Sequence, residues 1–384
     1  QIEGFADYGF PMSHAASFAQ LVYVSAWIKR HYPDVFCAAM LNAQPMGFYA
    51  PAQLVRDAAM HGVEIRGPDV NASGWDYTLE PPPSCGEVAN EAHGWGANRC
   101  AVRLGLRQIK GFREEHAKAL VEARGHGFDG IRHLALAASL PSEALSRLAE
   151  ADAFRSLGLD RREALWCVKG LDGGAEDSRI AVPAAPIFKD ADAEALRREE
   201  EVRLPALRLG EHIVQDYMSL SMSLKAHPLS LLRPRMATRG ITPNVQILEM
   251  KDGARIAVAG LVLIRQRPGT ASGVIFVTLE DEAAIANIIV WPRVFETYRR
   301  ELLASRLLMV TGKLQREGLV THIVADRLID LSDDLRLLSA THGNRCEALA
   351  RADQVKHDGQ GSWRDAPHRR RRNAEAIPKS RDFR

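Results

Sequence analysis

The chain has 384 residues, of which 46% are hydrophobic and 26% are charged, and its formal net charge is +2. This length and composition predict a globular, soluble protein with hydrophobic cores for two or three domains. No apolar run approaches the roughly 18 residues of a membrane span and no signal pattern opens the chain, so we expect a cytoplasmic protein without a membrane partner.

The five cysteines are scattered and include no C-x-x-C pair, which argues against a disulfide framework and against a structural zinc site. Cys85, His93 and Cys100 could in principle gather a metal, but their spacing fits no common pattern. We therefore predict no metal site in this chain.

Positive charge is concentrated in two segments. Residues 364–384 carry eight Lys and Arg against three acidic residues, and residues 99–124 carry seven against three. Residues 1–363 together sum to −3, so the basic character is local. Such concentration favours a polyanionic partner.

The first 80 residues predict helices and one short strand. Apolar residues recur at helical spacing after Ser13, a plausible N-cap, and Pro33 can end one helix and open the next. The chain begins with Gln1 within residues that already resemble folded protein, so we expect it to start inside a larger one. The predicted elements are helices His14–His31, Asp34–Leu41 and Pro51–His61 and the strand Val63–Ile65.

Three short runs in this part carry a family resemblance: Ser13-His-Ala-Ala16, Gln44-Pro-Met-Gly-Phe-Tyr49 and Asp69-Val-Asn-Ala-Ser-Gly-Trp75. Together with the surrounding residues from Tyr8 to Glu80, they resemble the end of the fingers region of bacterial C-family DNA polymerases, the class of the polymerase III alpha subunit. The second and third runs resemble its error-prone, damage-inducible branch, while Pro11-Met12 departs from the family pattern.

The resemblance implies that the intact protein is a DNA-directed DNA polymerase acting in DNA repair and translesion synthesis, and that this chain is its C-terminal part. It implies two Mg²⁺ ions, held by aspartates of a palm domain upstream of Gln1, and a clamp-binding accessory mutagenesis protein as partner. It also makes Ser13, His14, Lys29 and Arg30 candidates for contacting the triphosphate of an incoming dNTP. For each residue taken singly, the favoured alternative is that Ser13 is only a helix cap and His14 only a first-turn residue.

Residues 81–98, which open with Pro81-Pro-Pro-Ser84, read as a linker loop, and residues 99–175 read as a tandem helix-hairpin-helix. In the first hairpin, Gly111 in the Lys110-Gly-Phe112 turn can take φ > 0 and let backbone N–H groups point outward at the start of a helix. Arg107, Lys110, Gly111 and Arg113 are the predicted DNA-binding residues. An ordinary helical corner with a solvated basic face is the alternative, and Arg113 stands where a second glycine is usual.

The second hairpin is degenerate, with helices expected over Ile131–Leu136 and Leu140–Phe154. Without a glycine at its turn, residues 150–153 are expected to pack rather than to bind phosphate. Residues 176–250 follow as a connector. Asp190 and Asp192 lie two apart in a strong helix former, where side chains diverge, so they do not suggest a pair of metal ligands. No catalytic residue is predicted in this chain, and direct clamp binding through Pro183–Phe188 is unsupported.

Residues 251–332 predict a five-stranded OB-fold barrel with a helix, Pro292–Leu303, after the third strand. Alternation places Ile275, Val277 and Leu279 of the second strand inward and leaves Phe276 outward. In the third strand, Ala286, Ile288 and Val290 point inward, which leaves Trp291 outward. The predicted strands are Ile256–Gln266, Val274–Glu280, Ala286–Trp291, Leu307–Leu314 and Leu319–Ile329.

Two outward aromatics on neighbouring strands would form a stacking platform for single-stranded nucleic acid, with Arg265, Arg267 and Lys313 beside it. In the alternative reading Trp291 packs under the helix that begins at Pro292.

Residues 333–384 are predicted to be a disordered basic tail. The fold class is therefore multidomain α+β: a helical fingers remnant, a helix-hairpin-helix region, an OB-fold barrel and a tail. The function predicted is DNA binding, to primer-template duplex and single-stranded template, within an error-prone polymerase. A non-enzymatic nucleic-acid binding module is the alternative. An anticodon-binding domain of a tRNA synthetase is disfavoured because no ATP-site signature accompanies it.

Overall fold

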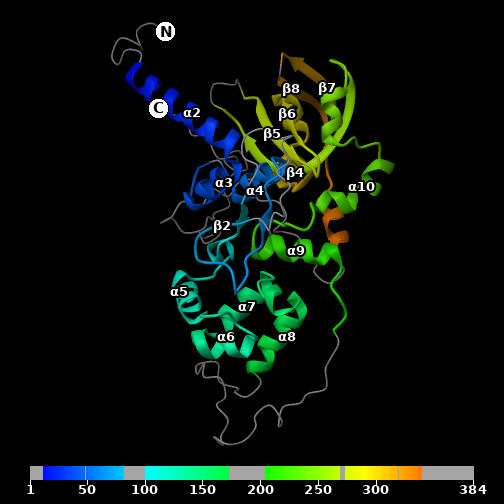
Figure 1. The fold of residues 1–384 in the computed structure, drawn as a ribbon. Coiled ribbons are helices and arrows are strands. Elements are labelled where there is room, and N and C mark those ends of the chain that lie inside the picture. The colour runs from blue at the N-terminus through cyan, green and yellow to red at the C-terminus, as the bar shows by residue number, and fades with distance from the viewer. Residues whose placement is uncertain are drawn as a thin grey trace, which may run out of the picture. The chain divides into compact units, whose positions relative to one another are not determined.

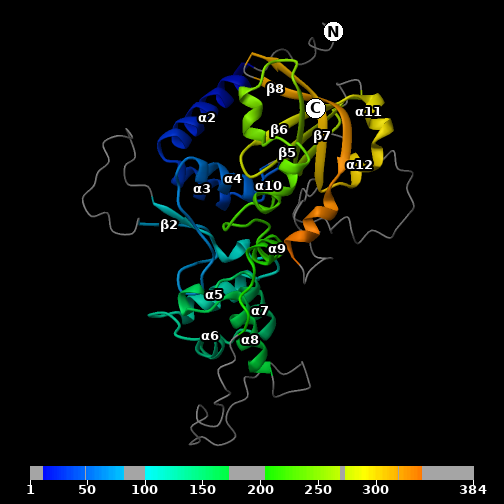
Figure 2. The ribbon, with the colours of Figure 1, turned by 90° about the vertical axis from the view of Figure 1, so that its right-hand side faces the viewer.

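The computed structural model describes residues 12–47, 49–81, 100–172, 204–268, 273–318 and 320–339. The chain divides into two compact units, residues 1–191 and residues 192–384. Figures 1 and 2 show the helices and strands of both units from two directions. Among the described residues, no helix is both long enough and apolar enough to cross a membrane.

The described part of the first unit opens with three helices, α2 (Met12–His31), α3 (Pro33–Asn42) and α4 (Pro51–Met60). Prolines occupy the first positions of α3 and α4, where a missing N–H costs no hydrogen bond. Helices α3 and α4 bury apolar stripes that include Leu41 and Val55, whereas none of the residues of α2 is buried. The predicted helices are confirmed, except that α2 already begins at Met12, so Ser13 lies inside the helix rather than before it.

A small sheet in strand order β1-β3-β2 follows. Its strands are β1 (Ile65–Arg66), β2 (Thr78–Glu80) and β3 (Ala101–Arg103). The central strand β3 pairs in parallel with β1 and antiparallel with β2. The sequence predicted a strand only near β1. Runs of two or three residues are too short for the alternation of polar and apolar residues to show.

The described residues after β3 in the first unit form helices and turns. A 3₁₀ turn, η1 (Leu106–Gln108), precedes α5 (Glu114–Ala123), α6 (Ile131–Ala138), α7 (Ser142–Glu150), the 3₁₀ turn η2 (Arg155–Leu157) and α8 (Arg161–Asp172). Helices α5, α6 and α7 each bury residues three or four apart, such as Ala117 and Leu120 in α5. The hairpin prediction is confirmed with one difference, because the first limb is a single 3₁₀ turn rather than an α-helix.

The second unit is built on a closed barrel with strand order β4-β5-β6-β8-β7. The elements are β4 (Arg255–Gln266), β5 (Ile275–Glu280), β6 (Ile285–Val290), the short helices α11 (Pro292–Thr297) and α12 (Arg299–Ala304), β7 (Leu307–Glu317) and β8 (Val320–Asp330). The five strands and the helix position predicted for an OB-type barrel are confirmed. So is the alternation, since Ile275, Val277 and Leu279 are all buried in the barrel core.

One side of the barrel is covered by α9 (Leu209–Ser219), α10 (Pro228–Thr238) and the 3₁₀ turn η4 (Ser332–Leu338), and another 3₁₀ turn, η3 (Asn244–Glu249), leads into β4. A second apolar cluster joins these elements to Ala259 and Leu261 of β4, so β4 is buried on both faces. By contrast, outward residues of β5 and β6 such as Asn287 keep exposed surface. The folded unit also extends beyond residue 332, the predicted end of the barrel domain, because Leu335 and Leu338 are buried. Residues 340–384 lie outside the described part of the chain.

Candidate nucleic-acid interface

The turn between η1 and α5 has the positive φ at glycine that the sequence predicted, whereas the N–H of Phe112 is bonded within the turn and does not point outward. Gly111 adopts φ +78°, which a side chain with a Cβ rarely takes. The N–H of Phe112 donates to the carbonyl of Ile109 at 3.1 Å, and both of these side chains are buried, so the turn is anchored from below. Lys110, Gly111 and Arg113 are exposed at its tip.

The charge at this turn is smaller than the sequence count suggests. Arg113 is 71% exposed and lies 3.2 Å from Glu115, while Lys118 pairs with Glu114 at 2.8 Å. Carboxylates in the first turn of α5 are favourable at the positive end of a helix dipole. They also offset part of the attraction that the basic residues would exert on a phosphate.

The Arg107 side chain forms hydrogen bonds within the fold. Its guanidinium donates to the Asp76 carboxylate at 2.7 Å and to the backbone carbonyls of Asn42 and Gln44 at 3.3 and 3.0 Å. A cation held by three internal acceptors is not presented to a ligand. Of the four residues predicted at the hairpin, Lys110, Gly111 and Arg113 are brought together at the surface and Arg107 is not.

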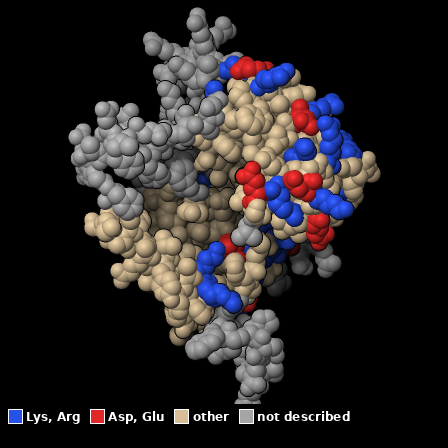
Figure 3. Space-filling view, turned by 90° about the horizontal axis from the view of Figure 1, so that it is seen from above, with Lys and Arg blue, Asp and Glu red and all other residues tan. Residues whose placement is uncertain are grey.

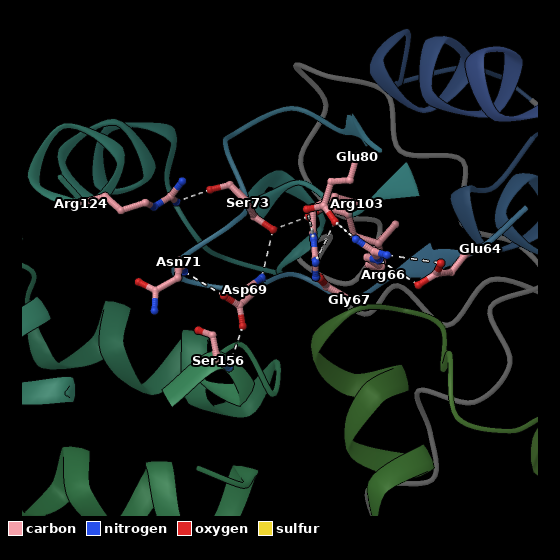
Figure 4. A network of polar contacts seen from close by, with 11 residues as sticks. Glu64, Arg66, Gly67, Asp69, Asn71, Ser73, Glu80, Arg103, Arg124 and Ser156 are labelled. Carbon is pink, nitrogen blue, oxygen red and sulfur yellow. Dashed lines mark hydrogen bonds and ion pairs between the residues drawn. The ribbon is translucent and has the colours of Figure 1, made fainter. Parts of the chain in front are cut away.

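Two further arginines of the basic segment are also used internally. Arg103 donates to Glu80 at 2.7 Å and to the carbonyl of Gly67 at 2.8 Å (Figure 4). The guanidinium of Arg124 donates to the carbonyls of Val70 and Ser73. The Arg103 contacts hold the small sheet together, and the Arg124 contacts join the end of α5 to the loop between β1 and β2.

The Asp69-Val-Asn-Ala-Ser73 run, part of the family resemblance, forms the centre of this polar network (Figure 4). The buried Asp69 carboxylate accepts the N–H groups of Asn71 at 2.8 Å and Ser156 at 3.0 Å. Asn71 exchanges two hydrogen bonds with the backbone of Phe128, at 3.0 and 2.7 Å. Ser73 donates to the carbonyl of Leu104 at 2.7 Å. Sequence reasoning recognised the run but not its role in holding the hairpin region.

The second hairpin turn packs, as predicted. Asp152 takes φ +62° without a glycine, and the N–H groups of Ala151, Asp152 and Ala153 all donate to carbonyls of α7. The Asp152 carboxylate is held by Arg155 at 2.9 and 3.0 Å. The backbone of this turn therefore has no amide directed outward.

On the barrel, Trp291 is 52% exposed at the start of α11. The helix instead uses Phe295 to reach the barrel core. The structure thus supports the outward reading of Trp291 over packing beneath the helix. Phe276, opposite Ile289 on β6, is half-buried and shares the outward side of this strand pair.

The basic residues around this platform differ in their surroundings. A bulge between Val262 and Ile264 sets Arg265 opposite Val277, on the inward side of β5, and its guanidinium donates to the carbonyl of Ser305. Arg265 therefore joins β4 to the α12–β7 loop and does not lie beside Phe276.

Arg267 and Lys313 are both exposed. The Arg267 guanidinium lies 5.9 Å from the centre of the Phe295 ring, in α11, the helix that starts next to Trp291. Lys313 of β7 is paired with Val324 of β8, and Val324 is paired with Ile289 of β6. Ile289 in turn lies opposite Phe276 of β5, so Lys313 and Phe276 belong to the same row of paired residues across the four strands. These two cations remain candidates for contacting a backbone phosphate.

The described surface seen in Figure 3 carries basic and acidic side chains interspersed, not an uninterrupted basic area. Ion pairs of the second unit agree with this, for example Arg255 with Asp326 at 3.6 Å and Arg239 with Asp334 at 2.7 Å. Aromatic stacking would therefore have to supply a substantial share of any single-strand affinity.

The four candidates for the triphosphate lie at the two ends of α2. Ser13 and His14 are in its first turn, and Lys29 and Arg30 in its last. Fifteen residues of helix separate His14 from Lys29, about 22 Å at 1.5 Å per residue. Lys29 also pairs with Asp57 at 2.8 Å. One triphosphate would not span both pairs, so a nucleotide would meet one end or the other.

Within the described part of the chain, no group of three or more His, Cys, Asp and Glu side chains could hold a metal ion. Asp190, Asp192, Cys85 and His93 lie outside that part, as does the Pro183–Phe188 segment. Cys100 is described, and its N–H donates to the buried Asp34 carboxylate at 2.8 Å.

Comparison with known proteins gives a consistent set of relatives. The family described as "Helix-hairpin-helix motif" matches residues 62–164. "Error-prone DNA polymerase 1" of Rhizobium meliloti (strain 1021) is 51% identical over 348 residues, which cover 88% of this chain and 30% of the relative. "Error-prone DNA polymerase" of Ruegeria pomeroyi is 52% identical, covering 87% and 28%, and that of Sinorhizobium medicae is 46% identical, covering 100% and 36%.

Two solved structures each match about a fifth of the chain. Asparaginyl-tRNA synthetase from Pyrococcus horikoshii is similar with a TM-score of 0.19 and 22% identity, over 21% of this chain and 20% of that one. The S. pombe Stn1-ten1 complex gives a TM-score of 0.19 and 17% identity, over 22% and 64%. The chain as a whole spans about a third of the length of the curated relatives it matches.

Proposed function

We propose that this chain, which matches about one third of the length of error-prone DNA polymerases, is a DNA-binding portion of such an enzyme. In this proposal the hairpin turn binds the backbone of duplex DNA, and the outward face of β5 and β6 binds a single strand. The helix-hairpin-helix match over residues 62–164 supports the first site.

The observation that carries the proposal is the exposed turn at Gly111. A glycine at φ +78°, between exposed Lys110 and Arg113 and just before α5, forms an exposed backbone turn with two cations to which a phosphate could bind. A purely structural corner would not need a basic residue on each side of the glycine.

On the barrel, Trp291 and Phe276 offer aromatic faces, and Arg267 and Lys313 offer cations, on an outward surface that α9, α10 and η4 leave open. Aromatic side chains combined with scattered positive charge suit single-stranded nucleic acid, whose bases can stack and whose backbone needs only loose neutralisation.

For the whole enzyme we propose DNA-directed DNA synthesis in repair and translesion synthesis, with an incoming dNTP near one end of α2 and a clamp-binding accessory protein as partner. DNA polymerases use two metal ions, which stabilise the attacking and leaving oxygens. The described residues do not fit such a site, so no step of nucleotide transfer is assigned to them.

The test uses the whole chain with labelled duplex, labelled oligo-dT and a primer-template. We expect binding of both DNA forms, with affinity that falls linearly on a log–log salt plot, and no primer extension with Mg²⁺ or Mn²⁺. Failure to bind either form would refute the proposal. Templated extension by the pure chain would refute the assignment of catalysis to other parts of the enzyme. The alternative, a separate non-enzymatic binding module, is less favoured because the match to polymerases extends well beyond the hairpin and the barrel.

A further inference from the structure

Arg147 of α7 lies against the hairpin turn, although α7 belongs to the second hairpin. A Cβ built on Gly111 would lie 3.6 Å from Nε of Arg147, 3.7 Å from its Cζ and 3.9 Å from Nη2. The guanidinium therefore covers the side of the turn that the glycine leaves open. No sequence pattern links the two residues, which are far apart in the chain.

The guanidinium of Arg147 is held only loosely by carboxylates. Its ion pairs with Glu143 and Glu150 are 3.5 and 3.6 Å long, and its side chain is 40% exposed. Exposed pairs at such distances contribute little and exchange readily. Arg155, by comparison, is held by two short hydrogen bonds to Asp152.

We propose that Arg147 is a phosphate-binding residue of the hairpin turn and completes a cluster with Lys110 and Arg113. This inference rests on the proposed function. An arginine offers a planar fork of donors that fits phosphate oxygens, and here its guanidinium lies against the exposed turn that carries Lys110 and Arg113. On binding, the phosphate replaces Glu143 and Glu150 as the partner of the guanidinium.

The arrangement gives the second hairpin a role in DNA binding. The backbone N–H groups of its own turn already donate to carbonyls of α7. The second hairpin therefore contributes a side chain to the first hairpin and does not form a second backbone site for phosphate. The two hairpins then form one phosphate site between them.

The experiment measures duplex binding by the whole chain across a salt series for the wild type, Arg147→Gln, Arg147→Lys and Arg155→Gln. Arg155 is the matched control, since its charge is also on this helical region but is held by Asp152. We expect Arg147→Gln to weaken binding about fivefold at 0.15 M salt and to flatten the log–log slope by about 0.9, the effect of one lost phosphate contact. Arg147→Lys should keep most of the slope, and Arg155→Gln should change it little.

A double-mutant cycle with Glu143→Gln keeps the inference testable if Arg147→Gln melts early. Removing the competing carboxylate should tighten binding, and this gain should shrink when Arg147 is also replaced. If the wild type fails to bind duplex DNA, the proposed function itself fails. If the wild type binds and Lys110→Gln flattens the slope, while Arg147→Gln behaves like Arg155→Gln, the inference about Arg147 is overturned and the proposed function stands.

Discussion

Replacing Trp291 by alanine separates a binding role from a packing role. Truncating a fully buried tryptophan costs about 3–5 kcal/mol. Because Trp291 keeps 52% of its surface exposed, roughly half of that, about 2 kcal/mol, is expected as a loss in unfolding free energy. The barrel should therefore remain folded at room temperature.

The same change should weaken oligo-dT binding by about 1–3 kcal/mol, which is about 5- to 150-fold in Kd, because one base loses its stacking partner. The salt slope should stay the same, since no phosphate contact is removed. Trp291→Phe should recover much of the affinity. Fluorescence anisotropy across a salt series measures both quantities.

Leu248→Ala is the matched control, because Leu248 is also a large exposed apolar residue of the second unit, 66% exposed in η3. It should leave oligo-dT binding unchanged. If Trp291→Ala melts much earlier than the control but binds oligo-dT normally, the side chain serves packing, and the single-strand site must lie elsewhere.

Three other predictions concern the fold. Arg265→Ala should lower barrel stability by about 1.5–3 kcal/mol in urea unfolding, because the guanidinium serves a backbone carbonyl, and a flattened salt slope would contradict this. Gly312→Ala should cost about 3 kcal/mol or more, since its Cβ would lie 2.1 Å from the carbonyl oxygen of Val324, and a soluble variant with wild-type melting would exclude that close approach. The Arg103 hydrogen bond holds the pKa of Glu80 below its usual value of 4.5, so this stabilisation is complete above the unfolded pKa and is lost as pH falls through the folded one. Glu80→Gln should therefore show a smaller drop in Tm between about pH 5 and about pH 3, and an identical drop would count against the pairing.

Local patterns allowed much of the fold to be predicted. Strand alternation identified the five barrel strands and their inward residues, because the two-residue period is a property of the backbone alone. A glycine after a basic residue and before an amphipathic helix identified the turn at Gly111, because a positive φ is a local demand. Prolines identified the starts of α3 and α4, because a proline at the first position of a helix loses no hydrogen bond, which is also a local property.

The short sheet strands and the end of the second unit escaped prediction. Strands β1, β2 and β3 are held by pairing with each other rather than by any periodic pattern of their own. Leu335 and Leu338 looked like part of a polar tail, and only their packing against α9 and α10 shows that they belong to a core.

By itself, the sequence determined which segments form helices and strands, which barrel residues point inward and where the chain needs a left-handed turn. Only the tertiary structure decided which cations are available to a ligand. Arg107 and Arg113 look alike in the sequence, but the acceptors that occupy Arg107 come from residues 31 to 65 positions away. The bulge in β4 likewise turned Arg265 inward, and chain folding brought Arg147 to Gly111. The surroundings of Arg107, Arg265 and Arg147 are thus set by packing between segments that are distant in the sequence, which no local pattern shows.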